Sequence, residues 1–319
     1  HASVNITCSR CGTTFPWSAY EQLLCERGTF VKPTTCSNCA ESVLSESQAP
    51  PPPAPEHHQV VSIPSKGKWN RDRAIADRPP HLDPDTIADA EHADVRIVAL
   101  GDDLTFSSQV KEQAWPFLLE QKLNAELEDE GVSVAVVNAG IPRTTSRQAL
   151  VRLARDVEPF APNLVIFSFA FGDSVLIPRP DSNSWNELIG LDEAENAISQ
   201  LCGRLSRAHA RALYWTTNPM LPEDCGKAPG KFDADRWAKD QTARKQHILA
   251  HALRACRERD IDVLDLRSRF EVNGSKSARK WMRDWYRHND SGARNIASWM
   301  AGCILKNDLL AVHREVAAH

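Results

Sequence analysis

Four cysteines near the start of the chain stand in two C-x-x-C pairs. Cys8 and Cys11 form the first pair, and Cys36 and Cys39 form the second. Each pair can bend into a knuckle that points two thiolates at one ion, and two knuckles supply the four sulfur ligands of a tetrahedral zinc. We therefore predict a structural zinc site on these residues, because a short segment with few large apolar side chains rarely folds without such a staple. Cys25 is expected to be a small buried hydrophobe, since four sulfurs already satisfy the ion.

Acidic side chains follow two strands of a predicted sheet, and another lies near the end of the chain. Asp102 and Asp103 come after the first strand, Asp173 follows the third, and Asp284 lies four residues before His288. Carboxylates gathered at strand ends could hold Mg²⁺ or Mn²⁺ and activate water for phosphoester hydrolysis. One of them could also act as a general base or nucleophile, as in glycosyl transfer. For Asp102 and Asp173 we favour a plainer role as turn residues that cap the following helices.

The elements that must position these residues begin near residue 95, where apolar strands alternate with amphipathic helices. Continuous apolar strands spaced by helices predict a three-layer α/β fold with a parallel sheet of about five strands, and a ligand crevice at their carboxyl ends. The expected strands are 95–100, 132–140, 163–171, 212–217 and 262–266. The expected helices are 108–130, 144–157, 191–209, 234–259 and 291–311.

The bulk composition limits the classes of function. The chain has 319 residues, a net charge of −4 and nine cysteines. An odd number of scattered cysteines argues against a disulfide framework and predicts a reducing, cytoplasmic location. Apolar runs stay well short of the roughly 20 residues that span a bilayer, so no membrane partner is expected. We predict a zinc-binding segment at 1–45, a proline-rich irregular linker at 46–93, and the α/β domain at 94–319.

The front segment resembles a family of small bacterial zinc-ribbon domains over residues 4–42. The likeness rests on C-x-x-C-G-x-x-F, Glu21-Gln22, Gly28, Pro33 and the second C-x-x-C. It implies a structural zinc and little about a partner. The charges of the segment are balanced, so we expect a structural module, or one that docks to protein, rather than a nucleic-acid binder.

The strand ends, taken in order, resemble the four sequence blocks of the SGNH, or GDSL-type, hydrolases over roughly residues 95–311. The matching stretches are Gly101-Asp102-Asp103, Asn138-Ala139-Gly140, Gly172-Asp173 and the segment from Asp284 to Met300. The resemblance implies an SGNH-like (flavodoxin-like) fold. It also implies a serine nucleophile, a glycine and an asparagine that stabilise an oxyanion, and a final D-x-x-H pair.

The chain departs from that pattern where the chemistry would occur. Gly140 matches the glycine and Asp284 the acid, but the serine position holds Asp103 and the asparagine position holds Gly172, followed by Asp173. The histidine position holds Arg287, and His288 comes one residue late. Arginine cannot be a general base, and loss of one oxyanion donor costs about 10²–10³ in rate.

A conventional serine esterase is therefore the third choice. Ser107 and Ser108 lie beyond the turn, and we expect neither to replace the nucleophile. The leading hypothesis is a divergent member of the superfamily that acts, if it is catalytic, by carboxylate chemistry at Asp103. Its ligand would be anionic or sugar-bearing, with nucleic acid a candidate. The alternative is an inactive binding or docking protein in which Asp103 pairs with Arg287.

A basic and aromatic stretch, 267–288, runs into the last block. It holds seven Lys and Arg residues against two acids, interleaved with aromatic side chains. Arginine contacts phosphates and aromatic rings stack on bases, so a nucleic-acid or nucleotide-like ligand fits this composition. The expected ligand-binding residues are Arg279, Lys280, Arg283 and Trp285. The alternative is a solvated helix face whose aromatic side chains pack inward.

Overall fold

A computed structural model describes residues 4–17, 22, 34, 84–108, 110–178, 184–221, 233–271 and 278–310. The chain divides into two compact units, residues 1–69 with 311–319, and residues 70–310. Cys25, Cys36, Cys39 and most of the predicted linker lie outside the described residues. Within the described ranges, no helix is both long enough and apolar enough to cross a membrane.

The described part of the first unit contains a two-stranded antiparallel hairpin. Strand β1 (Val4–Thr7) pairs with β2 (Thr14–Trp17). In the turn between them, the amide of Cys8 donates to the carbonyl of Thr13 at 2.9 Å, and the amide of Gly12 donates to the carbonyl of Cys8 at 3.0 Å. The first C-x-x-C pair therefore occupies this turn, with Gly12 in the left-handed region that favours glycine, at φ +73°.

The second unit is built on a parallel sheet of five strands, as predicted from the apolar runs. Its order is β4-β3-β5-β8-β9, and every neighbouring pair is parallel. The strands are β3 (Val95–Gly101), β4 (Val134–Gly140), β5 (Leu164–Ser168), β8 (Arg211–Thr216) and β9 (Asp262–Asp265). The central strands are buried almost throughout, because both faces of the sheet are covered by helices.

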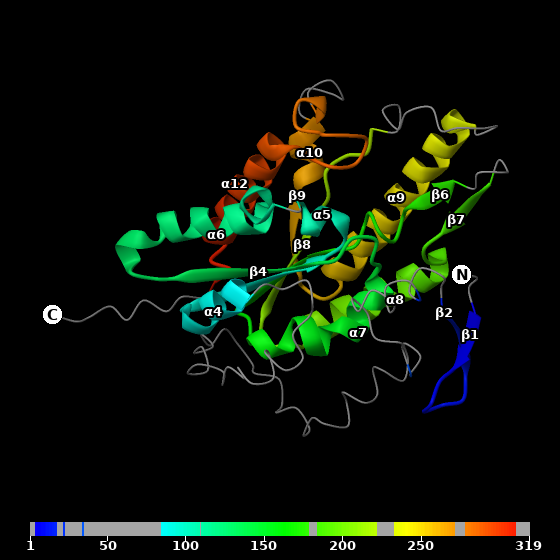
Figure 1. Cartoon of the computed structure of the whole chain (residues 1–319), viewed down its shortest axis with the longest axis horizontal. Coiled ribbons are helices and arrows are strands. Elements are labelled where there is room, and N and C mark those ends of the chain that lie inside the picture. Colours follow the sequence, from blue (N-terminus) through cyan, green and yellow to red (C-terminus); the bar gives the residue numbers. More distant parts are fainter. Residues whose placement is uncertain are drawn as a thin grey trace. The chain divides into compact units, whose positions relative to one another are not determined.

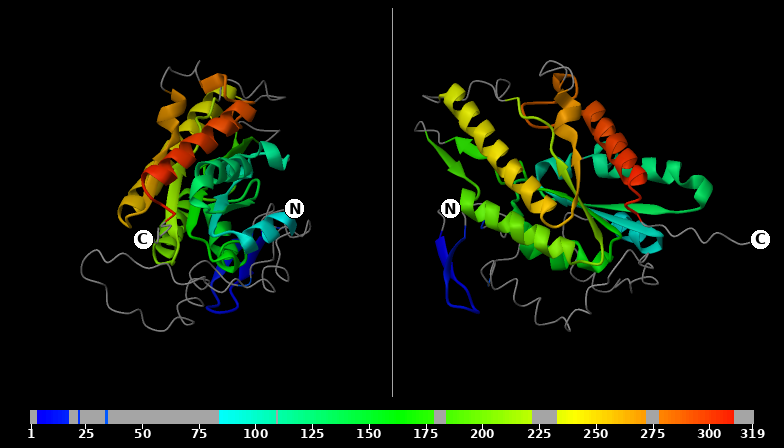
Figure 2. Two further views of the ribbon diagram at one scale, coloured as in Figure 1. Left: turned by 90° about the vertical axis from the view of Figure 1, so that its left-hand side faces the viewer. Right: turned by 180° about the vertical axis from the view of Figure 1, so that it is seen from behind.

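Helices cover the sheet in two layers (Figure 1). Helix α6 (Trp115–Glu126) packs against α12 (Asp290–Lys306) on one face, and α7 (Ser146–Asp156) packs against α8 (Leu191–Ser206) on the other. The long helix α9 (Ala234–Arg257) lies beside α8, and the views from the side and from behind show the same layering (Figure 2). The three-layer α/β prediction is confirmed for this unit.

Some elements differ from the sequence expectation for local reasons. Strand β5 ends at Ser168 rather than at residue 171, because the chain turns there and the amide of Asp173 bonds back to the carbonyl of Phe169. The helix expected from residue 108 begins at Trp115, with a proline in its first turn. Helix α4 (Pro84–His92) lies in the range expected to be irregular, since a proline at the start of a helix lacks only an amide that would be unpaired there.

The remaining elements are short and were not predicted. They are α5 (Asp103–Phe106), α10 (Leu266–Glu271), the hairpin strands β6 (Leu176–Pro178) and β7 (Trp185–Glu187), and three 3₁₀ turns at Lys111–Gln113, Glu128–Glu130 and Glu158–Phe160. Helix α5 is a single turn directly after β3, and it determines where the first block places its side chains.

Candidate functional site

The first three blocks meet at one edge of the sheet. In the strand register, Gly101 at the end of β3 pairs with Gly140 of β4 on one side and with Ser168 of β5 on the other. A side chain on Gly101 would collide with the hydroxyl of Thr105 at 2.0 Å, so only glycine allows α5 to turn this tightly over the strand. The residues that follow these strands are thus brought together, as the parallel topology predicts.

Asp102 is a structural carboxyl that joins the first and third blocks. One of its oxygens accepts from the amide of Leu104 at 3.0 Å and caps α5, and the other accepts from the amide of Gly172 at 2.8 Å. The capping role expected for Asp102 is observed. Its complete burial, with a contribution from the charge of Asp103, raises its pKa to about 7 despite these two hydrogen bonds.

Asp103 occupies the first residue of α5, facing the loop after β4. Its Oδ2 atom accepts from the amide of Arg143, whose own backbone has a φ of +58°. Burial raises the pKa of Asp103, while the Arg143 amide and the charges of Arg143 and Arg287 act in the opposite direction. The Asp103 charge also helps to raise the pKa of Tyr286, after burial. Asp103 therefore lies among two guanidinium groups and a phenol.

The positions that would stabilise an oxyanion are already used. The amide of Gly140 donates to Oδ1 of Asn138 at 3.1 Å. A Cβ atom on Gly172 would lie 1.8 Å from the carbonyl oxygen of Thr144, so the structure has no room for the side-chain donor that the family carries there. Both features oppose oxyanion stabilisation beside Asp103.

In the last block, Asp284 and His288 contact different partners rather than each other. Asp284 pairs with Arg287 at 2.6 Å and accepts from the amides of Tyr286 and Arg287 at 3.1 and 2.8 Å. No ion pair links Asp103 to Arg287, two residues that the structure describes. His288 is 5% exposed, and its Nε2 atom lies 2.7 Å from the hydroxyl of Ser107.

Ser107 is one of two serines that were not expected to act as the nucleophile. It ends α5 one helical turn after Asp103, and its hydroxyl also accepts from the amide of Trp115 at 3.2 Å. The expectation that this serine is poorly placed does not hold with respect to His288. The sequence pattern did not indicate it, because the backbone at Ser107 leaves the helical conformation, with φ +67° and ψ −59°.

Asp173 is buried and caps a different helix from the one expected. Its Oδ1 atom accepts from the amide of Ser146 at 2.8 Å, at the start of α7, whereas the expectation was a cap of the helix that follows it. Burial raises its pKa to about 8. Among the described residues no group of three or more His, Cys, Asp or Glu side chains is arranged to hold a metal ion.

Described residues of the basic and aromatic stretch pack with Trp299 and form a surface of cations and aromatic rings. The rings of Phe270, Trp281 and Trp299 pack edge to face at 5.4 to 5.5 Å. Lys280 lies over the ring of Trp281 at 4.4 Å, and Arg269 lies over that of Trp299 at 5.9 Å. Both cations are exposed, so this surface combines positive charge with aromatic rings.

Of the expected ligand-binding residues, three are exposed and one contributes to packing. Arg279, Lys280 and Arg283 lie at the surface, while the Trp285 ring packs against Trp237 at 5.1 Å and near Phe171 at 5.9 Å. The stretch thus contains a packed aromatic interior beneath a charged exterior.

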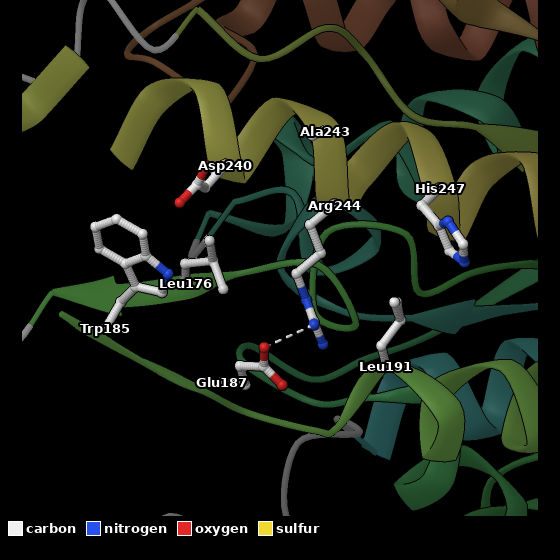
Figure 3. A pocket seen from close by; sticks show the side chains of 8 residues that line it. All are labelled: Leu176, Trp185, Glu187, Leu191, Asp240, Ala243, Arg244 and His247. Carbon is white, nitrogen blue, oxygen red and sulfur yellow. Dashed lines mark ion pairs between the residues drawn. The ribbon is translucent and has the colours of Figure 1, made fainter. Parts of the chain in front are cut away.

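A separate pocket of about 310 Å³ lies behind the third block, between the β6–β7 hairpin and α9 (Figure 3). Trp185 and His247 stand at opposite ends of it, and Arg244 points across it to pair with Glu187 at 3.0 Å. Arg244 also donates to the carbonyl of Asp173 at 3.1 Å. The pocket contains none of the sequence-predicted site residues.

We expect one zinc ion per chain, held by Cys8, Cys11, Cys36 and Cys39. The described half of the site suits this: the first pair lies in the hairpin turn, and the amide of Ser9 bonds to the carbonyl of Thr34 at 2.9 Å, two residues before Cys36. Metal analysis of the purified chain should give close to one zinc per molecule, and Cys36→Ser should lower that value by more than half. Cys303→Ser is the matched control, and equal zinc in both variants would contradict the prediction.

Residues 99–294 match the sequence model of the GDSL-like Lipase/Acylhydrolase family, and no curated protein matches the chain. Similar solved structures include the lipase/acylhydrolase from Enterococcus faecalis, 18% identical, with a TM-score of 0.50 over 67% of this chain and 96% of that one. A putative GDSL-like lipase from Parabacteroides merdae is 14% identical, with a TM-score of 0.52 over 68% and 97%. An alpha/beta hydrolase enzyme from the metagenome of Lake Arreo is 17% identical, with a TM-score of 0.51 over 66% and 97%. At these identities the structures show the fold alone, but the family match covers more than half of the sequence, and the chain belongs to the GDSL-like lipase/acylhydrolase family.

Proposed function

We propose that this family member uses its crevice to bind a ligand that carries both phosphate and sugar, with single-stranded nucleic acid as the representative. The observation that carries the proposal is the exchange of the serine and histidine positions of the family for Asp103 and Arg287. The serine nucleophile is replaced by a hydrogen-bond acceptor, Asp103, and the histidine base by a permanent cation, Arg287. These two groups are better suited to bind charged and hydroxylated ligands than to cleave an ester.

The charges around Asp103 suit such a ligand. Arg143 and Arg287 both act on its carboxylate, so its negative charge is offset. Guanidinium groups bind phosphate oxygens through paired hydrogen bonds, and a carboxylate accepts hydrogen bonds from sugar hydroxyls. One crevice could in this way hold both parts of a sugar phosphate.

The exposed basic and aromatic surface could bind further phosphates and bases of a single-stranded nucleic acid. Lys280 and Arg283 are exposed and have no carboxylate partner among the residues that the structure describes. The partly exposed rings of Trp281 and Trp299 offer stacking surfaces beside these cations. Cations that follow a backbone, interleaved with aromatic rings for bases, are the combination by which proteins bind single strands.

The test is binding of a fluorescent single-stranded oligonucleotide, followed by anisotropy from about 50 to 200 mM salt. Replacing Arg279, Lys280 and Arg283 together by alanine should weaken binding at least tenfold and reduce the salt slope by about 0.7 for each lost phosphate contact. Arg287→Ala should weaken binding further.

The matched control removes the same charge elsewhere, at the exposed residues Lys239, Arg257 and Lys306. Equal weakening by the two triple variants would mean that only net charge matters. Absence of binding by the wild-type protein at low salt would refute the proposal.

A second candidate, carboxylate catalysis by Asp103, is favoured by one observation. Burial raises the pKa of Asp103, which brings a carboxylate closer to the range in which a general base works at neutral pH. Cleavage of the bound oligonucleotide that disappears in Asp103→Asn, while binding remains, would support this candidate over binding alone. A conventional serine esterase is the least favoured, because the oxyanion positions at Gly140 and Gly172 are taken.

A further inference from the structure

We propose that Ser107 and His288 form a second nucleophile–base pair, at positions that the family does not use, and that Ser107 accepts an acyl or phosphonyl group covalently. The inference goes beyond the proposed binding function and does not depend on it. It rests on the contact between the two side chains, the backbone at Ser107 and the surroundings of His288.

The hydrogen bonds around the Ser107 hydroxyl allow it to donate its proton to His288. The amide of Trp115 can only donate, so the hydroxyl oxygen accepts from it at 3.2 Å. The hydroxyl proton is then free to point at Nε2 of His288, 2.7 Å away. In that arrangement Nε2 carries no proton and Nδ1 does, which is the tautomer that a general base needs.

His288 is held neutral. Its burial lowers its pKa to about 4, and the nearby charge of Asp284 opposes this only in part. Among the described residues, its Nδ1 atom has no hydrogen-bond partner. The imidazole can therefore accept a proton at neutral pH, although it holds the proton weakly.

The backbone at Ser107 is strained in a way that exposes a reactive side chain. Ser107 has φ +67° and ψ −59°, and the amide of Ser108 bonds to the carbonyl of Phe106 at 2.8 Å, which closes a γ-turn centred on Ser107. This form of the γ-turn is rare for any residue other than glycine, and such strain gathers at functional sites. The side chain of Ser107 remains partly exposed there.

Two shifts relative to the family restore a serine–histidine contact. On the first block the serine lies four residues later, directly after the last residue of α5. On the last block the histidine lies one residue later, after Arg287. The two shifted residues, Ser107 and His288, lie in contact.

The residues around Ser107 predict that an acyl or phosphonyl group is transferred to it and that the adduct is then hydrolysed slowly. Asp284, which would orient and stabilise a protonated histidine, is occupied by Arg287. The amides of Gly140 and Gly172 donate to Asn138 and Asp102, so neither is available to an oxyanion. We therefore expect slow transfer with activated reagents and a long-lived adduct.

A fluorophosphonate reagent makes the step explicit. The Oγ atom of Ser107 forms a bond to phosphorus, the phosphorus–fluorine bond breaks, and fluoride leaves. The hydroxyl proton passes to Nε2 of His288 and then to solvent. No oxidant, reductant or metal is needed.

The experiment treats the full-length protein with a fluorophosphonate and locates the adduct by peptide mass spectrometry. We expect one adduct, on Ser107, that forms at least 10²-fold more slowly in His288→Gln. Ser107→Gly should abolish it and should also raise the melting temperature, because glycine adopts the γ-turn without strain. The neighbouring change Ser108→Ala should leave labelling intact.

The pH profile separates a base from a structural histidine. Labelling should stay level from pH 8 down to about 6 and fall toward the pKa of His288, about 4. No adduct on Ser107, an adduct that survives Ser107→Gly, or equal rates in wild type and His288→Gln would each overturn the proposal. Binding of oligonucleotide would be unaffected by such a failure, so the two proposals can fail separately.

Discussion

Replacing Gly172 with alanine should lower the free energy of unfolding by about 3 kcal/mol, at the upper end of the usual cost of overpacking. The added Cβ atom would lie 1.8 Å from the carbonyl oxygen of Thr144 and 3.4 Å from Cβ of Asp102. The nearer contact is with backbone, so no side-chain rotation can relieve it. Any movement of Thr144 would also disturb the loop that carries Arg143.

The same substitution at Gly302 is the matched control. Gly302 lies within α12, and an added Cβ there would meet nothing within 4 Å. Alanine in a helix is favoured over glycine by about 0.5–1 kcal/mol, so Gly302→Ala should be neutral or stabilising. Urea unfolding of both variants checks the prediction, and a Gly172→Ala variant as stable as wild type would show that the loop after β4 can move.

The Gly172 result also bears on the evolution of the site. Gly172→Asn would reintroduce the asparagine that the family carries at this position, but the Cβ atom of that asparagine would collide with the carbonyl oxygen of Thr144. We expect that variant to lose stability without gaining esterase activity. Restoring the family's chemistry would require moving the 141–145 loop, and not one side chain alone.

The second large effect is a fall in stability as the pH rises from 7 to 8. Burial raises the pKa of Asp173 to about 8 from an ordinary value of 3.8, with Asp102 adding to the rise and Ser146 and Arg244 opposing it. A group that binds its proton more tightly in the folded state stabilises the protein below its unfolded pKa, and this stabilisation is lost as the pH rises through the folded pKa. The slope is about 1.4 kcal/mol per pH unit for one full proton and flattens near the folded pKa, so the fall from pH 7 to 8 is about 1 kcal/mol.

The pH window is chosen so that other groups do not mask the effect. The pKa of Asp102, raised to about 7 by burial, adds to the fall up to that pH. His288 acts in the opposite direction, because burial lowers its pKa from 6.5 to about 4, and it adds stability as the pH rises between those values. Between pH 7 and 8 Asp173 makes the largest contribution of these three groups, and Asp102, half ionised at pH 7, adds a smaller one.

Denaturant unfolding at pH 7, 7.5, 8 and 8.5 tests this prediction. In Asp173→Asn the residue at 173 cannot ionise, so the fall between pH 7 and 8 should shrink to the smaller contribution of Asp102. Glu128→Gln, which removes an exposed carboxyl, should keep it. A wild-type protein equally stable at pH 7 and 8, or an unchanged slope in Asp173→Asn, would mean that Asp173 is ionised in the folded protein.

The order of elements and the parallel sheet followed from the sequence because they depend on local pattern. Short apolar runs rich in β-branched residues, such as 95–100, favour buried strands, and helices between them favour a parallel arrangement. The meeting of Gly101, Gly140 and Ser168 at one sheet edge then follows from strand direction. The substitution of Asp103 for the family serine is likewise a property of the sequence alone.

Which side chains touch within that crevice was decided by the tertiary structure. The sequence suggested an Asp103–Arg287 pair, whereas Arg287 bonds to Asp284, three residues away, because a short turn in the last block places them together. It set Ser107 aside, whereas one turn of α5 carries that serine to His288. Hydrogen-bond partners depend on where side-chain atoms lie to within about 1 Å. The hydrophobic pattern of the sequence determines only the helices and strands that carry those side chains.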